Sequence, residues 1–235
     1  MTKALVSAAL AGALILAMSG AASASTVVYS ASGSGSDGAL SGQATISTGS
    51  GLLTVDLSSL EANPISIGQE VSGIVITFAS APPSFSSFTQ SGQLISVNSD
   101  GTFSDVSGSP SHWDDAVSVN SLYIATAGTG SKSGKPVDLI IGPGTGTAPD
   151  YYSNANASIV RAHTPQIQGT GIFTLAYTGP APLIQSVSIE FGTGPDTVLA
   201  GSVPVPEPAT WAMLIAGMAM AGGLMRRSRV RLTTA

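Results

Sequence analysis

The sequence predicts an all-β protein: an antiparallel β-sandwich of the jelly-roll or immunoglobulin-like kind with one short helix. Apolar and polar residues alternate with a period of two at 53–57 and at 187–191, which is typical of half-buried strands. Gly, Ser, Thr, Asn and Pro interrupt this pattern repeatedly, as expected for many short strands joined by turns. The two ends depart from the pattern and are predicted to flank the sandwich as a signal peptide and a transmembrane helix.

The expected strands follow one another with turn sequences between them. Ser36-Asp37-Gly38, Ser99-Asp100-Gly101 and Gly179-Pro180 have the chemistry of turns, with glycine available where φ is positive. Prolines flank segment 149–161, which favours a short helix there. The predicted strands cover residues 26–31, 42–47, 53–57, 73–80, 93–97, 121–125, 137–141, 173–177 and 187–191.

The region between the two ends is strongly acidic. Residues 25–202 contain three Lys or Arg and twelve Asp or Glu, a net charge of −9, whereas the whole chain has −5 because Lys3 and four C-terminal arginines outweigh Glu207. Such a charge repels phosphate backbones, so no nucleic-acid partner is expected. The chain has no cysteine, which excludes thiol catalysis and Cys-ligated metals.

The N-terminus has the order of a cleavable secretion signal. Lys3 precedes an apolar stretch at 4–18, and Ala22-Ser23-Ala24 forms an A-x-A site. We expect cleavage before Ser25, with the Sec translocon and signal peptidase as partners. The predicted organisation is a signal peptide at 1–24, one secreted β-sandwich domain at 25–202 and a C-terminal signal at 203–235.

The C-terminal segment combines a short motif, an apolar run and a basic end. Pro206-Glu207-Pro208 precedes fifteen uncharged residues at 211–225, fewer than the roughly 20 of a comfortable bilayer crossing. The arginines that follow would hold that end in the cytoplasm, so the body would face outward. These orienting residues are Arg226, Arg227, Arg229 and Arg231.

This tail resembles the C-terminal signal of PEP-CTERM proteins, the exosortase substrates of Gram-negative bacteria. Trp211-Ala212 matches the PEPxxWA variant, and an ordinary tail anchor would need neither Pro-Glu-Pro nor a cleavable signal. The resemblance implies an exosortase that cuts near the motif. It also implies transient anchoring in the inner membrane with the body in the periplasm, then delivery to the cell surface or extracellular matrix. The motif residues are Pro206, Glu207, Pro208, Ala209, Trp211 and Ala212.

One cluster in the body could carry chemistry. His112, Asp114 and Asp115 could bind a divalent ion or exchange protons. No convergent partners are identifiable, so a solvated loop with one packed tryptophan is favoured, and no metal or cofactor is expected. The sequence therefore predicts a non-catalytic surface or matrix protein that is not an enzyme.

Two other functions remain open at this point. The first is a carbohydrate-binding module of an exopolysaccharide matrix, whose exposed aromatic rings would stack on sugars. The second is an extracellular hydrolase centred on His112, Asp114 and Asp115, although no hydrolase motif is present. The candidate stacking rings are Trp113, Tyr123, Tyr151 and Tyr152.

Overall fold

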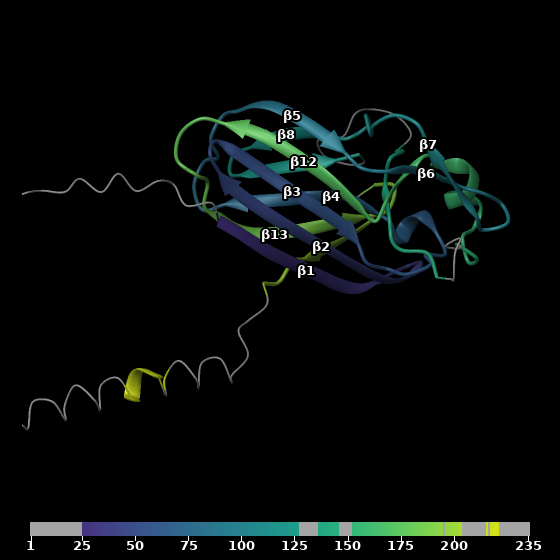
Figure 1. The fold of residues 1–235 in the computed structure, drawn as a ribbon, viewed down its shortest axis with the longest axis horizontal. Helices are drawn as coiled ribbons and strands as arrows, with labels where there is room; N and C mark the ends of the chain where they lie inside the picture. The colour runs from purple at the N-terminus through teal and green to yellow at the C-terminus, as the bar shows by residue number, and fades with distance from the viewer. Residues whose placement is uncertain are drawn as a thin grey trace, which may run out of the picture.

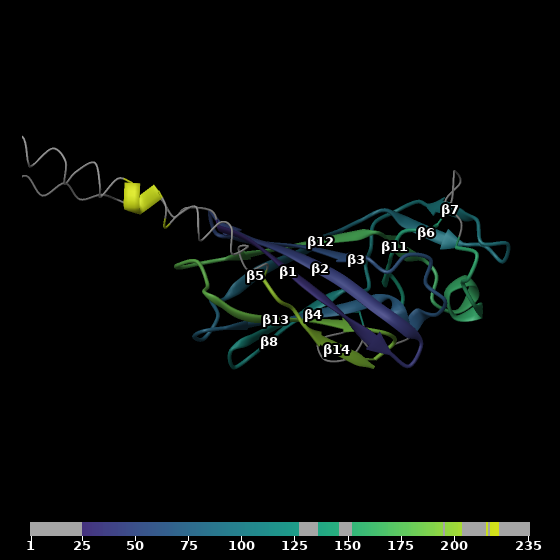
Figure 2. The ribbon, with the colours of Figure 1, turned by 90° about the horizontal axis from the view of Figure 1, so that it is seen from below.

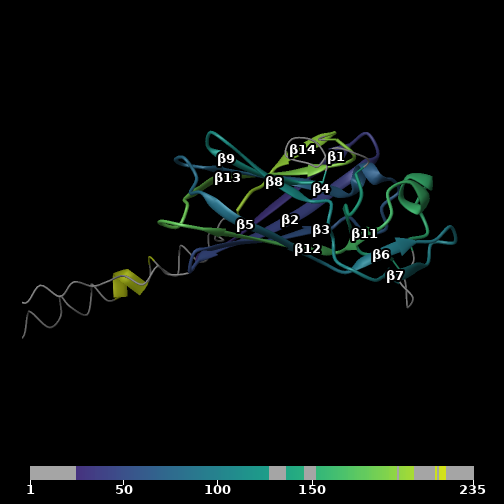
Figure 3. The same ribbon diagram turned by 90° about the horizontal axis from the view of Figure 1, so that it is seen from above.

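The computed structural model describes residues 25–126, 136–145, 152–194, 196–203, 215 and 217–220. Within these residues two β-sheets pack face to face, and Figures 2 and 3 show the two layers from opposite sides. The predicted all-β class is therefore confirmed. The predicted signal peptide at 1–24 and nearly all of the predicted C-terminal signal lie outside the described residues.

The first sheet has five strands, all antiparallel, and forms one broad layer (Figure 1). Its strands bury alternate residues: Leu53, Val55 and Leu57 are fully buried, whereas Thr54 and Asp56 between them are partly exposed. The predicted alternation is thus correct, and one face of this sheet is in contact with solvent. In spatial order the strands are β1 (Ser25–Gly35), β2 (Gly38–Gly49), β3 (Leu52–Ser59), β12 (Thr170–Tyr177) and β5 (Phe85–Ser91).

The second sheet is more complex because two strands pair with successive parts of the same side of β4. The beginning of β4 pairs with β10, and its remainder pairs with β9, which in turn pairs with β8. The strands β10 and β11 are parallel, so the sheet is not purely antiparallel as predicted. Its strands are β14 (Thr197–Ala200), β13 (Ile184–Phe191), β4 (Val71–Phe78), β10 (Ile140–Ile141), β11 (Gln166–Gln168), β6 (Leu94–Val97) and β7 (Phe103–Val106), with β9 (Ser121–Ala125) and β8 (Asp114–Ser118).

Helical structure in the body is short and differs from the prediction. Among the described residues of the segment expected to be helical, the helical element is η2 (Ser158–Ala162), a π-helix, and residues 152–156 before it are not helical. A second turn, η1 (Ile67–Gln69), is a 3-10 helix with a capping box. In this box Ser66 Oγ accepts from the Gly68 N–H at 3.1 Å, and Gln69 Oε1 accepts from the Ser66 N–H at 3.4 Å.

The hydrophobic core fills the space between the sheets. Its largest fully buried side chains include Trp113, Phe78, Phe173 and Phe191. Trp113 lies against Phe173, with ring centroids 4.5 Å apart. A smaller second cluster lies under β6, where Tyr152 and Ile159 pack against Ile95, Val97 and Ile141.

Candidate functional site

The residues of the predicted C-terminal signal lie almost entirely outside the described part of the chain. This applies to the whole Pro206–Ala212 motif and to all four orienting arginines. In the apolar run, Ile215 and residues 217–220 are described, and they are helical. No helix among the described residues is long and apolar enough to cross a membrane. The predicted transmembrane helix therefore remains a prediction.

The structure does show where the tail leaves the body. Ser202 forms an antiparallel bridge to Ser30 of β1: the Ser30 N–H donates to Ser202 O at 2.9 Å, and the Ser202 N–H donates to Ser30 O at 2.8 Å. Val203, the last described residue before the motif, is 48% exposed. The exit point is thus the open edge of β1, the strand that begins at the predicted cleavage residue Ser25.

His112 forms a contact that the sequence did not predict. Its Nδ1 lies 2.8 Å from Oδ2 of Asp138, whose side chain is 2% exposed while that of His112 is 51% exposed. The backbone N–H groups of Ser111 and His112 donate to the same carboxylate oxygen at 2.9 and 3.2 Å. The Asp138 carboxylate therefore anchors the segment that leads into β8.

The backbone of Asp138 adds a further bond to this anchor. Trp113 Nε1 donates to Asp138 O at 2.7 Å, and the Gln90 side chain bonds both the N–H and the carbonyl of Trp113. Asp138 itself adopts a positive φ of 60°, which is uncommon for a residue other than glycine. In the sequence, Asp138 stands between the apolar residues Val137 and Leu139. This was the one sequence signal that could have identified Asp138 as a paired residue, because an acidic side chain that is buried must find a partner.

The side chains of His112, Asp114 and Asp115 are not placed to hold a metal ion together. The two carboxylates begin β8, and His112 bonds Asp138 instead. Burial raises the pKa of Asp115, and the neighbouring charge of Asp114 raises it further. Across the described residues, no group of three or more His, Cys, Asp or Glu side chains is placed to hold a metal ion.

The His112–Asp138 pair has one feature of a hydrolytic triad, a carboxylate on Nδ1. In a triad the nucleophile contacts the other ring nitrogen. Here the hydroxyl beside the ring is Ser111 Oγ. It lies 3.4 Å from Nδ1, the same nitrogen that contacts Asp138. The second histidine is elsewhere: His163 Nδ1 lies 2.6 Å from the carbonyl oxygen of Pro136.

Two of the four aromatic residues proposed as a sugar platform have no exposed face for stacking. Trp113 and Tyr152 are fully buried, and the Tyr152 hydroxyl donates to Gly142 O at 3.0 Å. These two rings are core residues, because their polar atoms find partners inside the protein. Tyr123 is partly exposed on β9, and Tyr151 lies outside the described residues.

Two buried carboxyl groups were not singled out from the sequence. Glu70 is 0% exposed, neither of its carboxyl oxygens has a hydrogen-bond partner, and burial raises its pKa well above the ordinary value. Glu190 on β13 is 5% exposed, and burial raises its pKa too. Desolvation therefore favours the neutral form of both groups.

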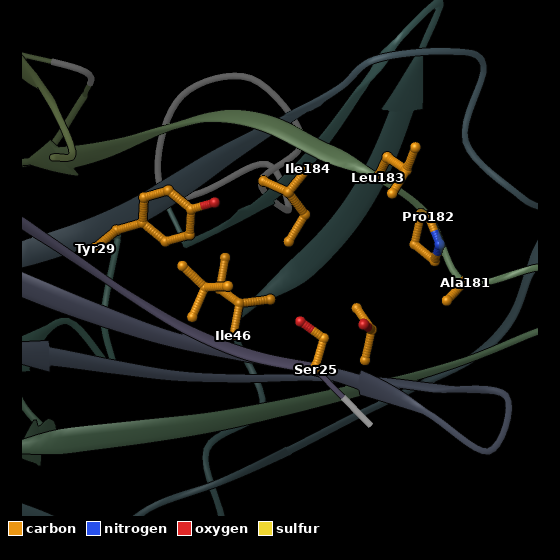
Figure 4. A pocket seen from close by; sticks show the side chains of 9 residues that line it. Ser25, Tyr29, Ile46, Ala181, Pro182, Leu183 and Ile184 are labelled. Carbon is orange, nitrogen blue, oxygen red and sulfur yellow. The ribbon is translucent and has the colours of Figure 1, made fainter. Parts of the chain in front are cut away.

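An apolar pocket of about 350 Å³ opens between β1 and the start of β13 (Figure 4). Tyr29, Ile46 and Ile184 line its inner part, and Pro182 and Leu183 lie on its other side. Leu183 is 74% exposed. The lining contains no titratable group other than the Tyr29 phenol, so it offers an apolar surface rather than reactive chemistry.

Comparison with known protein families identifies the tail. The family model described as the PEP-CTERM protein-sorting motif matches residues 204–230. The chain carries a PEP-CTERM sorting motif. This motif implies an exported protein that an exosortase sorts to the cell envelope or surface, as the resemblance in the sequence indicated. The match begins directly after the last described residue of the body, and a comparison with curated proteins gave no match.

Proposed function

We propose that this PEP-CTERM protein is a non-catalytic passenger that an exosortase cuts near Pro206-Glu207-Pro208. The signal peptide directs export, and the 211–225 segment anchors the chain transiently in the inner membrane. Cleavage then releases the β-sandwich to the cell surface or extracellular matrix. The sorting motif at 204–230 is the observation that carries this proposal.

The roles of the candidate side chains in the body support a passenger rather than an enzyme. Asp138 uses its carboxylate to hold backbone N–H groups, and Trp113 fills the core. Asp114 and Asp115 lie at the start of a strand, without His112 as a partner. Of the side chains that the sequence nominated for chemistry, His112 and Trp113 thus take part in bonds that hold the fold together.

The test is the intact mass and cell fraction of the mature protein in strains with and without the exosortase. With the enzyme, we expect a chain that lacks Arg226–Ala235 and is recovered outside the inner membrane. Replacing Pro206, Glu207 and Pro208 by alanine should leave a membrane-bound chain that retains these residues. The matched control replaces Leu232, Thr233 and Thr234 by alanine and should be processed normally. Recovery of the unaltered protein with its arginine tail in the strain that has the enzyme would refute the proposal.

A further inference from the structure

The outer edge of β1 carries backbone groups that have no strand beside them. In an antiparallel strand, successive residues direct their N–H and C=O groups to opposite sides. Ser30 directs both groups away from β2, toward Ser202. Val28 and Thr26 therefore direct theirs to the same open edge, where no described strand pairs with them.

The departing chain points along this open edge. The Ser30–Ser202 bridge is antiparallel, so the residues after Ser202 would run back toward Ser25 if the chain stayed extended. The chain is already close to β1 there, since a Cβ placed on Gly201 would lie 3.1 Å from Tyr29 Cβ. In this register residue 204 would face Val28, and residue 206 would face Thr26.

Burial of apolar surface would favour such pairing. Residue 205 would face Val27, whose side chain lines the apolar pocket together with Tyr29 and Ile46 (Figure 4). Because side chains alternate between the faces of a strand, residue 205 would lie on the pocket side. Residue 205 is a valine. Without an opposing feature, the tail could thus extend the five-stranded sheet and hold the sorting motif against the body.

The sequence places proline at the two donor positions that follow Ser202 in this pairing. Residues 202, 204 and 206 would direct their N–H groups toward β1, and residues 204 and 206 are Pro204 and Pro206, which have none. Proline is tolerated in an edge strand when its nitrogen faces solvent, but here both nitrogens would face the sheet.

We propose that Pro204 and Pro206 keep the sorting tail from adding to the edge of β1 as a sixth strand. The Pro-Glu-Pro motif then remains free to enter the exosortase. Pro204 is the first residue of the matched 204–230 segment, precedes the Pro-Glu-Pro core, and acts as a positioning residue through the β1 edge. This inference rests on the proposed processing for its functional consequence, although the pairing can be tested without any exosortase.

The first experiment measures amide hydrogen exchange in the full chain, purified in detergent from cells that lack the exosortase. In the unaltered protein we expect a protected Ser30 amide and freely exchanging Val28 and Thr26 amides. The double variant Pro204→Val, Pro206→Val should slow exchange at Val28 and Thr26 by about tenfold. Val205→Thr is the control, because the N–H of residue 205 would point away from β1, and it should change nothing. Protection of Val28 in the unaltered protein, or no added protection in the double variant, would overturn the proposal.

The second experiment measures the rate of tail removal in cells that have the exosortase. Pro204→Val leaves Pro206-Glu207-Pro208 intact and should slow removal several-fold, whereas Val205→Thr should not. Adding Val28→Pro removes the outward N–H of β1 without a loss of bonds to β2, and it should restore the rate. A Pro204→Val chain that is protected at Val28 but processed at the normal rate would contradict the positioning role. If the unaltered chain is not processed at all, the proposed function fails, and the exchange result still decides whether the prolines block pairing.

Discussion

Glu70 shows how strongly a single residue can depart from its usual chemistry in this fold. Its carboxyl group is completely buried at the end of η1, and neither oxygen has a hydrogen-bond partner. An ionised carboxylate in such a place would be very costly, so burial raises the pKa of Glu70 well above that of an exposed glutamate. The folded protein therefore holds a neutral Glu70 over a pH range in which the unfolded chain is ionised.

This difference predicts a pH-dependent gain in stability for Glu70→Gln. Below the unfolded pKa both states of the unaltered protein carry a proton on Glu70, and the two proteins should differ little. Between the unfolded pKa and the raised folded pKa, only the unfolded state ionises, so the unaltered protein loses about 1.4 kcal/mol per pH unit. Urea unfolding from pH 4 to pH 8 should show the variant gaining relative stability as pH rises.

Two comparisons make the Glu70 prediction specific. Glu190→Gln should change stability in the same direction, because burial raises the pKa of Glu190 as well. Glu61→Gln removes the same charge from a partly exposed side chain, and it controls for the change in net charge. A constant difference between Glu70→Gln and the unaltered protein at every pH would contradict the assignment of a neutral buried carboxyl group.

At the scale of single elements, β12 is the strand on which the two faces differ most clearly. It lies between β3 and β5, and its Phe173 is fully buried beside Trp113 and Phe88, with ring centroids 4.5 and 6.2 Å away. Its neighbour Ile172 points to the other face and is 41% exposed. The strand therefore offers a matched pair of apolar positions in opposite environments.

Phe173→Ala should lower the free energy of unfolding by about 3–5 kcal/mol, because it removes a core ring and leaves a cavity next to Trp113. Ile172→Thr should change it by less than about 0.5 kcal/mol, since a β-branched residue remains on the exposed face of a strand. Chemical denaturation followed by Trp fluorescence would measure both variants. Similar losses in the two would show that β12 does not have the described orientation.

All nine strands that the sequence predicted overlap observed strands, including those with regular alternation. The predicted strand at 121–125 coincides with β9, and those at 53–57 and 187–191 lie within β3 and β13. The strand predicted at 137–141 shrinks to β10 because Asp138 has a positive φ. No prediction covered β5, β7, β8, β11 or β14, which are short or lack a clear period of two and are fixed by pairing with distant strands.

At the scale of the whole molecule, both ends of the body converge on β1. The strand starts at the predicted N-terminus of the exported chain, and Ser202 pairs with it before the tail begins. The strand β14 packs beside it, with Leu199 against the main core. The contact between Ser202 and β1 therefore lies within the part of the chain that would remain after removal of the sorting tail.

We therefore expect residues 25–203 to fold without the tail, as the proposed product of sorting must. A chain of residues 25–196, which lacks β14 and the Ser202 bridge, should be less stable by about 2 kcal/mol or more, because Leu199 leaves the core edge. A chain of residues 25–210 is the matched control and should resemble 25–203. Thermal unfolding by circular dichroism would compare the three, and an unfolded 25–203 chain would contradict the expectation.

The sequence by itself determined the sorting motif, the all-β class and the best-patterned strands, because each is encoded in contiguous residues. The sorting motif can be identified from Pro206-Glu207-Pro208 and its neighbours without knowledge of the fold. Only the tertiary structure decided that Asp138 rather than Asp114 contacts His112, and that Trp113 is buried. It also placed residue 202 beside residue 30, which gave the spacing of the prolines a physical meaning. These contacts join residues far apart in the chain, and no local pattern encodes such pairings.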